Sequence, residues 1–178
     1  GLVDTQAARA AGVAAAEVPG GCFCCRFSEL IGAADRLLEH RPEVIFAEPV
    51  GSCTDIAATV LRPLKALYGE RFRLAPFTVL VDPGAARRRL AEDGSSNMAW
   101  LFSNQLAEAD IVCFTKTDIY TEFPELPRHV DFRLSAETGE GVEEWLQELL
   151  AGTRAAGGRV LQVDYARYAE AEAALAWL

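Results

Sequence analysis

The sequence predicts an α/β protein with a doubly wound, mainly parallel sheet and helices on both of its faces. Short continuous apolar runs, which are typical of strands buried on both faces, alternate with stretches of helical periodicity. Three of these runs lead directly into polar residues, at Glu48, at Thr115-Lys116-Thr117-Asp118 and at Ser135. Because ligands of such sheets bind beyond the carboxyl ends of the strands, we expect the functional groups at these points.

The individual elements follow from periodicity and breaker residues. We expect strands over residues 44–47, 77–81, 111–114, 131–134 and 159–163, with a short one at 17–18. We expect helices over residues 6–16, 29–40, 85–92, 97–109 and 141–150, with a last helix that reaches Leu178. Ser28 is the predicted N-cap of the second helix. Thr54 or Asp55 is the predicted cap of a further helix, which Pro63 kinks and Gly69 closes.

Composition restricts the class of protein. A length of 178 residues suits one domain, and 51% hydrophobic with 24% charged residues is ordinary for a globular protein. The net charge of -9 argues against a nucleic-acid partner or an anionic membrane. No apolar run has membrane-spanning length and no signal peptide is present. Three of the 5 cysteines are crowded together and the set does not make a disulfide framework, so we expect a cytoplasmic protein.

The densest chemistry lies in Gly20-Gly21-Cys22-Phe23-Cys24-Cys25, which we call the cysteine loop. Thiolates are soft ligands that select Zn²⁺ or Cu(I) over Mg²⁺ or Ca²⁺. Cys22, Cys24 and Cys25 leave one tetrahedral position open, as a transit site would. The alternatives are buried cysteines or a redox motif. The spacing is not Cys-x-x-Cys, and buried cysteines have no reason to cluster, so the pattern favours a metal.

Two motifs follow neighbouring strands and point to a nucleotide. The segment Thr115-Lys116-Thr117-Asp118, here called the 115–118 loop, is similar to the Asn-Lys-x-Asp guanine motif of GTPases. The Asp118 carboxylate can accept from both N–H donors of the guanine edge, and the Lys116 stem can lie along the base plane. Ser135-Ala136 follows the next strand, where such proteins back the guanine carbonyl. A plain Lys-x-Asp loop is the alternative, which the second motif disfavours.

Glu48-Pro49-Val50-Gly51 also follows a predicted strand. A carboxylate at Glu48 can hold the water shell of Mg²⁺ or place an attacking water, and the Gly51 N–H can meet a terminal phosphate. A solvated glutamate at a strand end explains this motif equally well.

Taken together, the chain resembles the CobW-like GTPases, metal chaperones related to the nickel-inserting GTPases of urease and hydrogenase maturation. The matching segments are the cysteine loop, residues 48–51, residues 105–110, the 115–118 loop and Ser135-Ala136. The resemblance implies a P-loop NTPase-like fold, with a GTPase domain over residues 1–152 and an added strand and helix over 153–178. It also implies GTP and Mg²⁺ as ligands, catalytic roles for Glu48 and Gly51, and Zn²⁺ or Co²⁺ on the three cysteines.

The same resemblance implies a partner: a client metalloprotein or a cobalamin-dependent enzyme. A homodimer is a further expectation. The alternative is a non-catalytic, GTP-dependent regulator or assembly partner in which the cysteines are structural.

Two features depart from the family pattern. Thr115 replaces the usual Asn, which in relatives ties this loop to the phosphate loop, so we expect an effect on affinity more than on base choice. No Gly-x-x-x-x-Gly-Lys-Ser/Thr phosphate loop is present. The family carries it further toward the N-terminus, so we expect truncation before Gly1 and a chain that hydrolyses GTP poorly as written.

Overall fold

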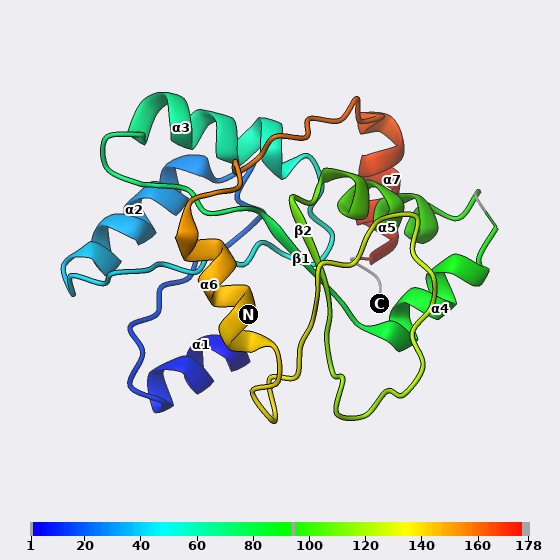
Figure 1. The fold of residues 1–178 in the computed structure, drawn as a ribbon. Helices are drawn as coiled ribbons and strands as arrows, with labels where there is room; N and C mark the ends of the chain where they lie inside the picture. Colours follow the sequence, from blue (N-terminus) through cyan, green and yellow to red (C-terminus); the bar gives the residue numbers. More distant parts are fainter. Residues whose placement is uncertain (1, 94, 176–178) are drawn as a thin grey trace. The chain divides into compact units, whose positions relative to one another are not determined.

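The chain divides into two units, Gly1–Cys53 and Thr54–Leu178, which are described separately. The structure is a computed structural model that describes residues 2–93 and 95–175 (Figure 1). Within these residues no helix is long and apolar enough to cross a membrane.

The second unit is built on a three-stranded parallel sheet in the order β1-β2-β3. The strands are β1 (Thr78–Val81), β2 (Ile111–Phe114) and β3 (Phe132–Arg133). Thr78 lies opposite Ile111, and Cys113 lies opposite Phe132. All four residues of β2 are at most 2% exposed, as the apolar run predicted. At the sheet edge, Leu80 of β1 is 55% exposed, so β1 is less buried than its sequence indicated.

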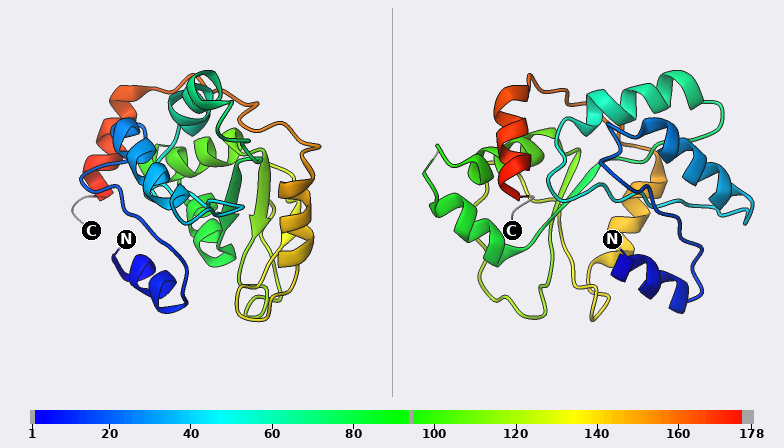
Figure 2. Two further views of the ribbon diagram at one scale, coloured as in Figure 1. Left: turned by 90° about the vertical axis from the view of Figure 1, so that its left-hand side faces the viewer. Right: turned by 180° about the vertical axis from the view of Figure 1, so that it is seen from behind.

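Helices cover both faces of this sheet, as predicted. Figures 1 and 2 show α6 (Val142–Ala151) on one side of the strands, with α4 (Pro83–Ala91) and α5 (Asn97–Glu108) on the other. Each face has its own apolar core. The core on the α4 and α5 side is formed by Val81, Ala86, Leu106, Ala109, Val112 and Phe114. The core on the α6 side is formed by Ile111, Cys113, Leu134 and Leu149.

The C-terminal part of this unit ends in α7 (Tyr165–Leu175), which packs against α5. The guanidinium carbon of Arg167 lies 5.1 Å from the centroid of the Trp100 ring. The strand predicted over 159–163 is wrong, because this stretch pairs with no described strand. Just before it, the Gly157 and Gly158 N–H groups donate to the Asp110 carboxylate instead of to a strand. The predicted helix end at 176–178 lies outside the described residues.

The helix predicted after Thr54 starts as a π-helix, η1 (Ala57–Leu61), and continues as α3 (Arg62–Tyr68). The change to α geometry falls just before Pro63, where a kink was predicted, and the helix ends at Gly69 as expected. The predicted N-cap is wrong. Neither Thr54 nor Asp55 caps the helix with its side chain, because the carboxylate of Glu108 takes the Ala57 N–H instead.

The first unit contains α1 (Leu2–Ala10) and α2 (Phe27–Leu38). The helix α1 begins earlier than predicted. It also ends earlier, because the Gly12 and Val13 N–H groups bond back to the Arg9 and Ala8 carbonyls, which closes the helix in a Schellman turn. The helix α2 matches the predicted one with both ends shifted by two residues. Its N-cap is not Ser28, whose hydroxyl donates to Glu29.

The strand predicted over residues 44–47 is absent, as is the one at 17–18. Val44 is 44% exposed and Phe46 is 66% exposed, so the apolar run is not buried. A strand is defined by its hydrogen-bonded neighbour. No described strand is hydrogen-bonded to this segment, so its composition alone does not make it a strand.

Candidate functional site

The carboxyl edge of the sheet in the second unit collects the predicted nucleotide-binding residues. The strand β1 leads into Asp82, β2 leads into the 115–118 loop, and β3 leads through Leu134 into Ser135. Because the three strands are parallel and in register, these segments meet at one edge.

Asp118 and Ser135 come from different strand ends and are directly bonded. The Ser135 hydroxyl donates to Asp118 Oδ1 at 2.7 Å and accepts from the Thr138 N–H at 3.1 Å. The Thr117 N–H donates to the Leu134 carbonyl at 3.2 Å, which adds a backbone link. Ser135 is fully buried, whereas Asp118 is exposed. The buried Ser135 hydroxyl therefore orients the Asp118 carboxylate from the protein side, and the rest of this exposed side chain faces solvent. Ala136, the other predicted member of this motif, is exposed beside Ser135.

Lys116 has an unusual backbone and a defined partner. Its φ of 57° is left-handed, a conformation that costs energy for a residue with a Cβ. Its Nζ lies 2.7 Å from Asp82 Oδ2. The hydrogen bond from Lys116, followed by that from the Ala85 N–H, lowers the pKa of Asp82 below its usual value. The same hydrogen bond to Asp82 raises the pKa of Lys116. Both groups are therefore held in their charged forms.

Thr115 is bonded to the neighbouring strand. Its N–H donates to the Val81 carbonyl at 2.9 Å and its hydroxyl donates to the same oxygen at 3.3 Å. The side chain at the position of the family Asn thus fastens the 115–118 loop to the end of β1.

Glu48 and Gly51, the predicted catalytic residues, belong to the first unit. Both are exposed, in a segment without regular secondary structure that turns at Gly51 and Ser52. Apart from Gly51 and its chain neighbours, no described heavy atom lies within 4 Å of the place that a Cβ on Gly51 would occupy, so a side chain there would meet open space.

The cysteine loop of the first unit brings three sulfurs together. The Sγ atoms of Cys22, Cys24 and Cys25 all lie within 4.8 Å of one another. A turn gathers them, in which the Cys25 and Arg26 N–H groups donate to the Cys22 carbonyl at 3.2 and 3.0 Å. Gly20 has a φ of 79°, and a Cβ there would lie 3.0 Å from the Arg26 guanidinium, so glycine lets that side chain pack over the loop.

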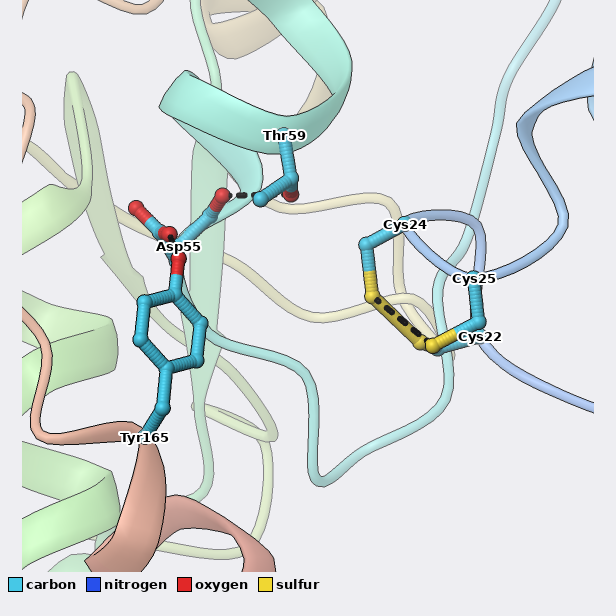
Figure 3. Close-up of a disulfide and its surroundings, with 6 residues drawn as sticks. All are labelled: Cys22, Cys24, Cys25, Asp55, Thr59 and Tyr165. Carbon is cyan, nitrogen blue, oxygen red and sulfur yellow. Dashed lines mark hydrogen bonds between the residues drawn. A yellow bond between two sulfur atoms is a disulfide. The ribbon is translucent and has the colours of Figure 1, made fainter.

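The sulfurs are not all thiols in the structure. Cys22 and Cys24 form a disulfide with a Cα–Cα distance of 5.5 Å, while Cys25 is free with its Sγ 3.8 Å from that of Cys24 (Figure 3). The prediction of three thiol ligands omitted this bond. A disulfide between cysteines two residues apart has no distinctive sequence signal. Sulfur–metal bonds of about 2.3 Å require sulfurs roughly 4 Å apart, so the reduced loop fits a thiophilic ion after small shifts.

A second polar cluster in the larger unit was not predicted as a site. Glu108, at the end of α5, is 1% exposed, and its Oε1 accepts the Ala57 N–H at 2.5 Å. Asp55, with a φ of 62°, accepts from the Tyr165 hydroxyl (Figure 3). Within the described residues, Glu108 Oε2, Asp55 Oδ1 and Thr54 Oγ1 are buried without a hydrogen-bond partner. The sequence signal for this cluster is limited to Glu108 itself, one of two acidic residues in the 105–110 segment.

Burial changes the acidity of Glu108. Desolvation, reinforced by the nearby charge of Asp55, raises the pKa of Glu108 from 4.5 to about 7, against the lowering effect of the Ala57 N–H. A buried thiol of the sheet behaves in the same way. Desolvation raises the pKa of Cys113 to about 12, so it stays a neutral core residue.

A strand-end loop with a lysine and a carboxylate, bonded to a serine from the next strand, thus lies at the carboxyl edge of a parallel α/β sheet, where such domains bind ligands. The family described as CobW/HypB/UreG, nucleotide-binding domain, matches residues 2–137, and the chain belongs to that family. No curated protein and no solved structure matches the chain at a significant level.

Proposed function

We propose that this protein binds and hydrolyses GTP, and that the nucleotide controls a thiophilic metal ion held on the cysteine loop for delivery to a client. The observation that carries the proposal is the bonded pair Asp118 and Ser135, which joins two motifs from different strands in a chain of this family. Neither motif alone would distinguish a guanine site from an ordinary loop.

Base selection rests on the direction of hydrogen bonding. The exposed side of the Asp118 carboxylate can accept from the two N–H groups on the guanine edge, whereas adenine offers an acceptor at one of these places. The bond from Ser135 keeps the Asp118 carboxylate in position and leaves it able to accept from guanine, because a carboxylate has about four acceptor sites. The Lys116 stem supplies an apolar surface for the plane of the base.

Hydrolysis is assigned to residues of the first unit together with Mg²⁺. Glu48 would hold the water shell of Mg²⁺ or orient the attacking water, and the Gly51 N–H would donate to the terminal phosphate. Mg²⁺ suits an oxygen ligand on an exposed carboxylate, since it keeps several of its own waters. The exposure of both residues supports this assignment.

The metal is assigned to Cys22, Cys24 and Cys25 in their reduced forms. Three thiolates select Zn²⁺ among common divalent ions, and Co²⁺ fits a role linked to a cobalamin-dependent enzyme. Reduction of the Cys22–Cys24 disulfide must come before metal binding, because a disulfide sulfur is not a thiolate. The client is a metalloprotein or a cobalamin-dependent enzyme.

That disulfide also favours a second candidate function. If Cys22 and Cys24 stay bonded in the working protein, the loop is structural and the chain is a GTP-dependent regulator or assembly partner without a metal. The two functions differ in whether metal binds at all under reducing conditions.

The proposal is tested by nucleotide titration of the full-length protein with fluorescent GTP, ATP and xanthosine triphosphate. Wild type should prefer GTP over ATP. Asp118→Asn replaces one acceptor by a donor, so it should lose GTP affinity and gain xanthosine triphosphate affinity. Equal discrimination by wild type and variant would show that the 115–118 loop does not read a base. Glu144→Gln, an exposed carboxylate of α6, is the matched control and should leave the preference unchanged.

A further inference from the structure

We infer that Asp82 is a positioning residue for guanine-nucleotide binding, which fixes the side chain of Lys116 beneath the base. This assignment rests on the proposed GTP binding. Asp82 is not part of the 115–118 loop or of the Ser135 motif; it follows β1.

The carboxylate of Asp82 is itself rigidly held. Oδ1 accepts the Ala85 N–H at 2.8 Å and thereby caps α4, and the Tyr120 hydroxyl approaches the same oxygen at 3.4 Å. The remaining oxygen, Oδ2, meets Lys116 Nζ at 2.7 Å. A helix-capping bond orders the side chain, so Asp82 presents a fixed negative charge to a flexible lysine.

Tyr120 closes a ring of contacts around this pair. Its N–H donates to the Lys116 carbonyl at 3.3 Å, so it belongs to the same turn as Lys116. Its hydroxyl reaches Asp82 because Gly84 has no side chain: a Cβ on Gly84 would lie 2.5 Å from that hydroxyl oxygen. The glycine therefore permits the close approach that ties the lysine turn to the start of α4.

Two successive residues of the loop are bonded to two successive residues at the end of β1. Thr115 bonds to the Val81 carbonyl, and Lys116 bonds to the Asp82 carboxylate. These bonds support the left-handed backbone of Lys116, which would otherwise be a strained conformation for a lysine. Backbone strain that several contacts together hold in place is typical of functional sites.

The consequence for binding is specific to the base. With Nζ held by Asp82, the apolar stem of Lys116 is ordered before a nucleotide arrives, so less side-chain entropy is lost on binding. The Lys116 side chain is 57% exposed and that of Asp82 is 26% exposed, so the pair is partly solvated and its effect should be moderate. The proposed contact of the stem is with the base alone, so the binding of phosphate groups should not depend on Asp82.

The test compares Asp82→Asn with wild type in the full-length protein, using fluorescent GDP and inorganic tripolyphosphate with Mg²⁺. Asparagine keeps the helix cap and removes the charge. We expect about 3- to 5-fold weaker GDP binding and unchanged tripolyphosphate binding. Glu92→Gln is the matched control, because it breaks a 2.7 Å ion pair with Arg89 near the other end of α4; it should alter neither affinity.

A second arm separates positioning from general stability. In a Lys116→Met background, which keeps an apolar stem without the charge, Asp82→Asn should weaken GDP binding no further. An equal loss in both backgrounds, or unchanged GDP affinity in Asp82→Asn alone, would overturn the assignment while the proposed GTP binding stands. A wild type that binds no guanine nucleotide would overturn both.

Discussion

The 115–118 loop and the cysteine loop carry the two halves of the proposed function, and they are built in different ways. The 115–118 loop is fastened to two other strand ends, through Val81 and Asp82 on one side and Leu134 and Ser135 on the other. The cysteine loop is a single turn in which the Cys25 and Arg26 N–H groups donate to the Cys22 carbonyl, with a disulfide inside it.

The difference indicates how each site responds to its surroundings. Sheet register fixes the residues of the proposed nucleotide site, so their geometry needs no chemical change before binding. The cysteine loop offers three ligands or one according to its redox state. Fixed geometry suits recognition of one base, and a small loop of variable chemistry suits a cargo that must be taken up and released.

The largest expected effect is on metal binding, which should be all-or-none. Reduced protein loaded with Co²⁺ should give sulfur-to-metal charge-transfer absorption, and protein in which Cys22 and Cys24 remain bonded should not, because it offers one thiolate. Cys24→Ala should remove the signal. Absorption spectroscopy with and without a thiol reductant measures this directly.

The control for that experiment is Cys113→Ala. Cys113 is 0% exposed and its pKa is raised to about 12 by burial, so it is no ligand and the signal should persist. Equal metal binding by wild type and a variant lacking Cys22, Cys24 and Cys25 would contradict the assignment.

The next effect concerns the buried carboxylate of Glu108, which is less completely hydrogen-bonded than the carboxylates at the carboxyl edge of the sheet. Because folding raises its pKa from 4.5 to about 7, the folded state binds the proton more tightly than the unfolded state. The stabilisation is complete below pH 4.5 and is lost as the pH rises through about 7. Glu108→Gln should remove this pH dependence and raise the free energy of unfolding at about pH 8 by up to about 3 kcal/mol.

Urea denaturation of wild type and variant at about pH 5 and about pH 8 measures the difference. Glu144→Gln, which changes an exposed carboxylate of α6, should show the wild-type pH dependence. A Glu108→Gln protein that loses stability between these pH values as wild type does would show that Glu108 is ionised throughout.

A smaller effect is expected at Ser135, which links two strand ends. Ser135→Ala removes the donor to Asp118 and the acceptor for the Thr138 N–H, which should weaken GTP binding by about 5-fold through a looser carboxylate. Nucleotide titration measures the change. Ser103→Ala, which removes a hydroxyl bond to Ala99 inside α5, should leave affinity unchanged. Equal affinities in Ser135→Ala and wild type would mean that the bond does not orient Asp118.

Much of the second unit could be predicted from the sequence, because there local pattern and tertiary contacts agree. The run at Ile111–Phe114 is a strand with the predicted bounds, since it lies in the centre of the sheet with apolar partners on both faces. The run at 44–47 has a similar composition and is no strand, because strand formation depends on a neighbour that composition does not specify.

The functional sites, like the fold, could be predicted only in part from the sequence. The meeting of Asp118 and Ser135 could be predicted from strand ends in a parallel sheet. The contact of Asp82 with Lys116 and the burial of Glu108 could not, because the sequence does not specify which side chain a carboxylate at a strand or helix end meets in the folded protein. The Cys22–Cys24 bond depends on redox conditions, which composition does not specify.

The central claim is that nucleotide and metal affinities are coupled, and one titration tests it most directly. Zn²⁺ is titrated into the reduced full-length protein in competition with a chromophoric chelator, first with GDP and then with a non-hydrolysable GTP analogue. Coupling free energies are typically about 1–3 kcal/mol, so Zn²⁺ affinity should differ by about 5- to 150-fold between the two states. Glu48→Ala supplied with GTP should stay at the GTP-state value, since it cannot complete hydrolysis. Identical Zn²⁺ affinities with the two nucleotides would contradict the chaperone function and leave the cysteines a structural role.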